Sequence, residues 1–196
     1  MKLRIHTLVA PVAALALAGA AHALPVTLTT TLSGAAESPP NASPGTGTGT
    51  VTFDIATHVL TVSETFSGLL AGTTASHIHC CTALPGSGNA GVATQVPTFS
   101  LFPLGVTSGT FTQTFDSSLA STYNPAFVTL AGSVSAAESM LFSGLAAGDA
   151  YLNIHTSQFP TGEIRGFLAP IPEPETSALM LAGLGLVAAM ARRRRR

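Results

Sequence analysis

The sequence predicts an all-β fold: an antiparallel, Greek-key-like sandwich with one short helix, preceded by an N-terminal signal helix and followed by a short C-terminal membrane helix. Two observations predict the β class, namely short segments in which apolar residues alternate with threonine and the Gly- or Pro-rich turns that separate them. The third observation is that much of the 46% hydrophobic content lies in two apolar stretches at the chain ends, although only 9% of the residues are charged.

Residues 1–23 have the organisation of a secretory signal peptide. Lys2 and Arg4 precede an uncharged apolar run at 8–21, and the Ala-His-Ala sequence at 21–23 is a small-x-small cleavage site. The run is shorter than the roughly 20 residues that span a bilayer, and Pro11 interrupts it, so a spanning helix fits poorly. We therefore expect cleavage after residue 23 and export of residues 24–170, through the Sec machinery, as a single domain.

Strands are expected along this domain wherever apolar residues alternate with polar ones. Val51, Phe53 and Ile55 point to one side of a strand. A turn at 56–58 separates them from Leu60 and Val62, which predicts a hairpin. Short strands bounded by Gly or Pro favour an antiparallel sandwich over alternating βα units. They are expected at 26–32, 91–96, 109–115, 126–130 and 150–156.

One segment favours a helix. Ser135 and Glu138 have the S-x-x-E spacing of a capping box, in which the serine caps the first turn and the glutamate reaches back to it. Apolar residues follow at helical spacing between 140 and 145, and Gly148 is a suitable stop. The sequence therefore predicts one short helix that leads into the strand at 150–156.

The charge of residues 24–171 excludes one class of function. Seven carboxylates and a single basic residue, Arg165, give this region a net charge near −6, whereas the other Lys and Arg residues lie in the two ends. The acids are Glu37, Asp54, Glu64, Asp116, Glu138, Asp149 and Glu163. A domain without a basic patch cannot neutralise a phosphate backbone, so we expect no nucleic-acid partner.

Residues 76–81, with the sequence Ser-His-Ile-His-Cys-Cys, contain the densest group of potential metal ligands. On a strand His77 and His79 share one face, with Cα atoms about 6.6 Å apart, and Ile78 faces the opposite side. His155 supplies a third imidazole if its strand is a neighbour and its side chain lies within about 8 Å of His79. Imidazole and thiolate ligands suit copper or zinc. The alternative is that these histidines only hydrogen-bond to backbone and loops in a polar seam.

Cys80 and Cys81 are the only cysteines of the chain. Cysteines outside the cytoplasm normally form disulfides, but neighbours on a strand point to opposite faces, so a vicinal bond requires a distorted peptide. Three interpretations remain open from the sequence: a vicinal disulfide, a bridge between two molecules, or thiolate ligands beside His77 and His79.

A turn is predicted at 160–162, Pro-Thr-Gly, with a new strand from Glu163. Glu163 and Arg165 then lie on one face, and Ile164 points into the core. Because Arg165 is the only cation of the domain, we expect a structural role in which it pairs with Glu163 or another carboxylate.

The last 26 residues, 171–196, combine three features in order: Pro172-Glu173-Pro174, a 15-residue apolar stretch at 177–191, and arginines that include Arg192, Arg193 and Arg194. The stretch spans only about 22 Å of a bilayer core about 30 Å thick, and the arginine side chains reach the cytoplasmic headgroups. This tail resembles the PEP-CTERM sorting signal. The resemblance implies transient anchoring in the inner membrane, recognition by an exosortase-type protease, and delivery to the cell envelope, outer surface or extracellular matrix.

The domain itself resembles the CHRD family, named after chordin. The resemblance rests on the segments 75–79, 151–156 and 162–166 together with Pro160. Cys80-Cys81 departs from the glycine that is common after the second histidine. The similarity covers about 26–168 and implies an extracellular all-β domain without a defined molecular activity. We expect it to have a surface or matrix partner, which the sequence does not identify.

No catalytic motif accompanies this resemblance. The sequence contains no G-x-S-x-G elbow, no phosphate-binding Gly-Lys-Ser or Gly-Lys-Thr and no H-E-x-x-H, and its acids form no obvious pair for glycoside hydrolysis. We therefore expect a non-catalytic surface or matrix protein. The alternative is an extracytoplasmic copper- or zinc-binding protein that uses the His/Cys cluster.

Overall fold

The computed structural model describes residues 24–171, 183–184 and 192–193. The predicted signal peptide, the Pro172-Glu173-Pro174 motif and Arg194 lie outside the described residues, whereas Arg192 and Arg193 are exposed. Within the described ranges no single helix is long and apolar enough to cross a membrane. Two consecutive helices, Pro125–Ala131 and Val134–Ala147, reach that length and composition only together, across a bend of 93°.

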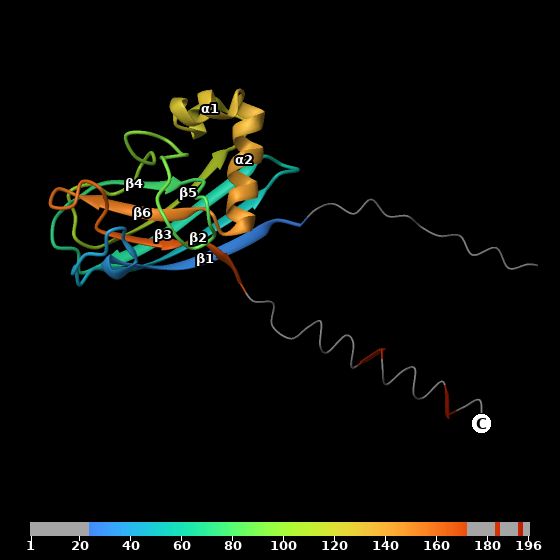
Figure 1. Ribbon diagram of the computed structural model, residues 1–196, viewed down its shortest axis with the longest axis horizontal. Helices are drawn as coiled ribbons and strands as arrows, with labels where there is room; N and C mark the ends of the chain where they lie inside the picture. The colour runs from blue at the N-terminus through green and yellow to red at the C-terminus, as the bar shows by residue number, and fades with distance from the viewer. Residues whose placement is uncertain (1–23, 172–182, 185–191, 194–196) are drawn as a thin grey trace, which may run out of the picture.

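The strands of the described region form one antiparallel sheet (Figure 1). Their order is β4-β6-β7-β1-β2-β3-β5, and the short β8 pairs with β1. The helices α1 and α2 follow β5 along the chain and lead into β6. The strands are β1 (Val26–Ser33), β2 (Thr46–Asp54), β3 (Val59–Ser67), β4 (Thr73–His79), β5 (Gly109–Asp116), β6 (Tyr151–Thr156), β7 (Ile164–Phe167) and β8 (Ala169–Pro170), and the helices are α1 (Pro125–Ala131), α2 (Val134–Ala147) and the 3₁₀ turns η1 (Gly34–Ala36) and η2 (Ala120–Thr122).

The sheet curls until its two halves face each other across one core. Four strands separate β4 from β3 in the sheet, yet the Ser76 hydroxyl on β4 donates to the Glu64 carboxylate on β3, at 2.8 Å from Oε2. Both residues are buried. α2 also packs on this core, where Phe142 stacks on Phe53 of β2 with ring centroids 4.6 Å apart. Among the largest fully buried side chains are Leu28, Leu60, Ile78, Leu152, Ile154 and Ile164.

The predicted all-β antiparallel class is confirmed, and the single curled sheet places its two halves against each other across the core, as the two sheets of a sandwich do. The hairpin also forms, as β2 and β3, and its apolar residues Val51, Leu60 and Val62 are fully buried. The alternating threonines lie on the other face, where the hydroxyls of Thr27 and Thr52 form a hydrogen bond at 3.0 Å. Alternation with period two therefore identified the buried face of these strands correctly.

Two predicted strands are wrong. Residues 126–130 lie in helix α1, which Asn124 caps by accepting from the Ala126 N–H, with Pro125 in the first turn and Gly132 in the left-handed conformation at the end. Residues 91–96 form only isolated bridges at Val92 and Thr94. Residues 24–171 thus contain two α-helices instead of one, because helix caps override the β propensity of a short apolar run.

The predicted helix exists, but it starts two residues early. Ser133 caps α2 by accepting from the Ala136 N–H, so Ser135 is not the cap. Glu138 does not reach back to the helix start, because its carboxylate accepts from the Ser117 hydroxyl and binds the His58 ring at 2.8 Å. The predicted stop at Gly148 is confirmed, since this residue has a positive φ of 78°.

Candidate metal centre

The candidate site residues lie on the face of β4, β6 and β7 that points away from the core. The register places His79 opposite Tyr151, His77 opposite Asn153, and Ala75 opposite His155. Odd-numbered side chains of these strands therefore share this face, while Ile78 and Ile154 enter the core. An outer sheet face is normally solvated, yet His77, Asn153 and His155 are buried, because loops cover it.

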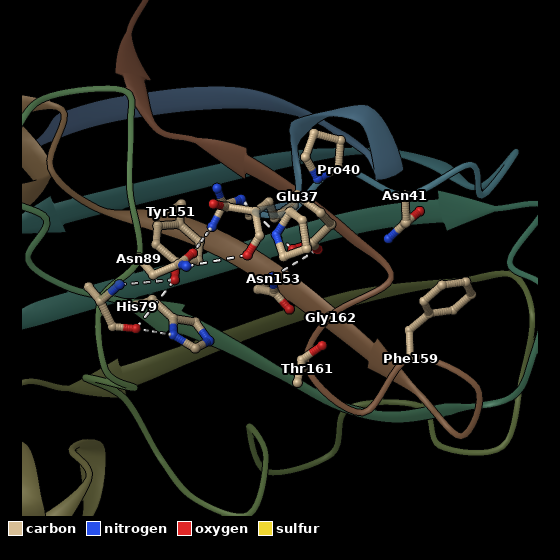
Figure 2. Close-up of a pocket in the computed structure, with 14 residues that line it drawn as sticks. Glu37, Pro40, Asn41, His79, Asn89, Tyr151, Asn153, Phe159, Thr161 and Gly162 are labelled. Atoms are coloured by element: carbon tan, nitrogen blue, oxygen red, sulfur yellow. Dashed lines mark hydrogen bonds and ion pairs between the residues drawn. The ribbon is translucent and has the colours of Figure 1, made fainter.

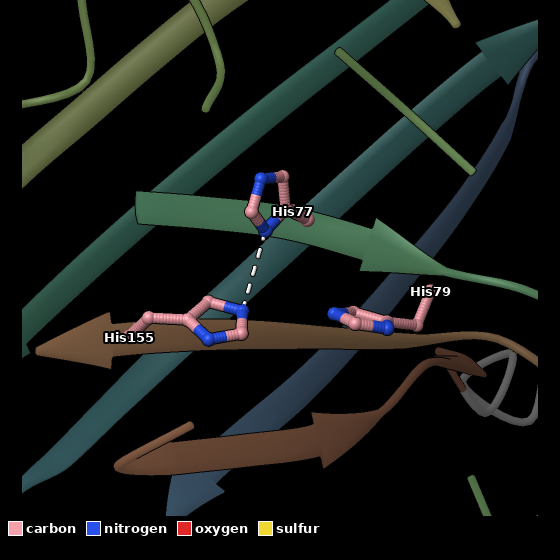
Figure 3. Close-up of side chains that lie close together, drawn as sticks. All are labelled: His77, His79 and His155. Carbon is pink, nitrogen blue, oxygen red and sulfur yellow. Dashed lines mark hydrogen bonds between the residues drawn. The ribbon is translucent and has the colours of Figure 1, made fainter. Parts of the chain in front are cut away.

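The three histidines point at one another (Figure 3). One ring nitrogen from each of His77, His79 and His155 lies within 4.8 Å of the other two. His77 Nδ1 and His155 Nε2 are 3.3 Å apart. The condition for a third imidazole is therefore met: β4 and β6 are neighbours, and the ring nitrogens of His79 and His155 lie closer than the roughly 8 Å that would exclude a shared ion.

The opposite nitrogen of each ring is bound to a backbone carbonyl from a covering loop. His77 Nε2 donates to Pro97 O at 2.8 Å, His79 Nδ1 to Ala90 O at 2.9 Å, and His155 Nδ1 to Pro160 O at 3.0 Å. A carbonyl oxygen only accepts, so these three nitrogens carry the protons of the neutral rings. Each facing nitrogen then presents a lone pair. Metal-binding histidines are oriented by this kind of outer hydrogen bond.

Burial keeps the three rings neutral. It lowers the pKa of His77 and of His79 to about 4, although the carbonyl bonds act in the opposite direction. The pKa of His155 is also lowered, again chiefly by burial. With neutral rings, two lone pairs face each other across the 3.3 Å between His77 and His155, and His79 Nε2 is buried without a hydrogen-bond partner. A cation at the centre satisfies all three nitrogens.

The distance between the two closest ring nitrogens fits a shared metal ion. Two nitrogens that each lie about 2.0–2.1 Å from a tetrahedral zinc ion are about 3.3 Å apart. The His77–His155 pair has this separation, and the His79 nitrogen, which lies within 4.8 Å of both, must move inward to reach it. Three histidines could therefore hold a metal here.

The two cysteines do not join this ligand set. Cys80 and Cys81 form a disulfide with each other, across a cis peptide bond, directly after β4. The sulfurs contact Gly144 of α2, where a Cβ atom would overlap both. Of the three interpretations that the sequence allowed, the structure has the vicinal disulfide, and disulfide sulfurs offer no thiolate.

Of the two expected pairings of Arg165, the one with Glu163 does not form and the one with another carboxylate does. The buried Glu163 carboxylate accepts from the Ser43 hydroxyl, the Leu70 N–H and the Thr156 hydroxyl at 2.6–2.7 Å. Arg165 instead pairs with Glu37, at 3.8 Å from Nε to Oε2. The loop after η1 brings Glu37 onto the outer face of β7, which no local pattern in the sequence indicates.

A cavity of about 450 Å³ adjoins the cluster at His79, whereas His77 and His155 are not among its lining residues (Figure 2). Its walls include His79, Tyr151, Asn153, Arg165 and Glu37. Sequence reasoning missed Tyr151, Asn153 and Glu37 as site residues. The first two carried a signal, because residues 151, 153 and 155 share one face of β6.

The fold and the site together define a class of protein: a single curled β domain with a buried triple-histidine cluster beside a cavity. The chain belongs to the CHRD domain family, whose model matches residues 28–168. The model of the PEP-CTERM protein-sorting motif matches residues 170–196. The combination identifies a secreted protein that is sorted to the cell envelope or surface by an exosortase, and neither match is to an enzyme family. Comparison with curated proteins and with solved structures finds no match to the chain.

Proposed function

We propose that this protein is a non-catalytic metal-binding protein of the cell envelope or extracellular matrix, whose CHRD domain holds one zinc or copper ion through His77, His79 and His155. The observation that carries the proposal is the hydrogen bonding of the rings. All three outer nitrogens donate to backbone carbonyls, so all three inner nitrogens converge as free lone pairs in a buried site. Neutral imidazoles are the nitrogen ligands that zinc and copper share.

The polar-seam alternative explains the site less well. Histidines that only tie loops to the sheet need one bond each, and those bonds exist. They do not account for the unpartnered His79 Nε2 or for the close approach of two lone pairs in His77 and His155. Burying unsatisfied polar atoms is costly, so their convergence favours a ligand-binding role.

Metal analysis of the exported protein tests this function. The wild-type protein, purified without chelators, is expected to carry one zinc or copper ion per chain, and the His77→Ala/His79→Ala variant is expected to carry almost none. His58→Ala is the matched control, because it removes a half-exposed imidazole that binds the Glu138 carboxylate and does not belong to the triple-histidine cluster. Equal and negligible metal in all three proteins would end the proposal.

The sorting half of the proposal concerns Pro172, Glu173 and Pro174. We propose Sec-dependent export, removal of residues 1–23, transient anchoring by the C-terminal apolar stretch, and cleavage near the motif by the exosortase. The intact mass of the surface-released protein is expected to lack the arginines at 192–196. A released protein that retains the complete C-terminal peptide would show that cleavage does not occur.

A further inference from the structure

The cavity beside the histidines has an unusual combination of unsatisfied groups. Asn153 is only 2% exposed, lines the cavity, and its Oδ1 has no hydrogen-bond partner. His79 lines the same cavity, and its Nε2, the atom that faces the other two histidines, is also unpartnered. Two residues from different strands that line one cavity thus each carry a buried polar atom without a hydrogen-bond partner.

We infer that this cavity binds a small hydroxycarboxylate, whose carboxylate takes the fourth position on the metal ion and contacts Arg165, and whose hydroxyl donates to Asn153 Oδ1. The inference rests on the proposed metal site. It adds the ligand that completes the site and names the residues that select it.

The anionic half of the ligand follows from charge. Three neutral imidazoles leave the full double charge on a divalent ion, and zinc with three protein ligands keeps a fourth position open. Arg165, the only Lys or Arg between residues 24 and 171, lies in the cavity wall. Its Nε and Nη1 donate to Ala36 O and Asn89 Oδ1, and within the described residues its Nη2 makes no hydrogen bond. Arginine and a divalent ion together favour a carboxylate.

The hydroxyl half follows from the acceptors. The Asn153 side chain is fixed because its Nδ2 donates to Glu37 Oε1 at 3.0 Å, which leaves Oδ1 as the acceptor without a donor. A carboxylate cannot satisfy this atom, since it only accepts. Gly162 holds the covering loop close to this pair, because a Cβ atom there would meet the Asn153 amide at 2.5 Å and Glu37 Oε1 at 2.7 Å. The loop therefore keeps the acceptor in place for a donor from the ligand.

The test uses the full exported protein loaded with Co²⁺, whose visible absorption reports on the ligands around the ion. Glycolate carries both groups, acetate carries only the carboxylate, and ethylene glycol carries only hydroxyls. We expect glycolate to change the spectrum saturably, with an affinity roughly 3- to 10-fold above that of acetate. This ratio corresponds to the net free energy of one hydrogen bond. Ethylene glycol is expected to have no effect.

The variant Asn153→Leu separates recognition from metal binding. It should still bind Co²⁺, which shows that the domain is folded, but glycolate and acetate should bind it equally. Absence of any Co²⁺ spectrum in the wild type would refute the metal site itself. A normal Co²⁺ spectrum that neither anion changes would refute the cavity as the ligand site and leave the metal site standing. If the wild-type protein bound glycolate and acetate with equal affinity, the proposal that the ligand is a hydroxycarboxylate would be refuted.

Discussion

Replacing Arg165 by methionine is expected to lower the free energy of unfolding by about 3 kcal/mol or more. Arg165 is 4% exposed, and its guanidinium contacts Ala36 O, Asn89 Oδ1 and the Glu37 carboxylate at once. It also lies over the Tyr151 ring, 4.7 Å from the centroid. Removing one partner of a buried pair leaves the others without donors, so the loss exceeds the net stabilisation that the pair provides.

Urea unfolding at neutral pH measures this effect. Burial raises the pKa of Glu37 to about 7, although Arg165 acts in the opposite direction. Below this pH Glu37 takes up a proton, so the variant is expected to lose less stability there than at neutral pH. The double variant Arg165→Met/Glu37→Gln is the matched control, because it also removes the orphaned charge. It should recover part of the lost stability. A decrease below about 1 kcal/mol in the single variant would show that Arg165 is not a structural cation.

Replacing Glu64 by glutamine is expected to stabilise the protein in a pH-dependent manner. The Glu64 carboxyl is 1% exposed in the core, and burial raises its pKa from 4.5 to about 8 although the Ser76 hydroxyl acts in the opposite direction. The protonated form favours folding, so its contribution is complete below pH 4.5 and is lost as the pH rises to about 8. The isosteric amide has no proton to lose.

The two proteins should therefore have similar stability near pH 4.5, and Glu64→Gln should be more stable near pH 8, by at most about 5 kcal/mol. Chemical unfolding at both pH values measures the difference. Asp116→Asn is the control for net charge, because it removes an exposed carboxylate from the adjacent strand β5. A stability difference that does not change with pH would contradict the raised pKa of Glu64.

The sequence was informative where structure depends on local alternation. Residues two apart share a strand face, which was enough to place His77 and His79 together and Ile78 in the core. The same argument predicted the hairpin of β2 and β3. It failed at 126–130, where the cap of Asn124 and Pro125 starts a helix that apolar residues alone do not reveal.

Contacts between distant segments could not be predicted in the same way. His155 faces His77 because β6 pairs with β4 after a long connection through β5 and both helices, and nothing local specifies that register. The carbonyls of Ala90, Pro97 and Pro160 come from irregular loops, whose paths depend on the finished sheet. For the same reason, a carboxylate partner for Arg165 was expected from the sequence but could not be identified as Glu37.

The central claim is that three neutral imidazoles share one metal ion. Anomalous diffraction from crystals of the zinc- or copper-loaded protein, recorded on both sides of the absorption edge, measures this directly. One peak is expected about 2.0–2.1 Å from His77 Nδ1, His79 Nε2 and His155 Nε2. A loaded crystal whose anomalous peak lies elsewhere, with no peak among these three nitrogens, would contradict the claim.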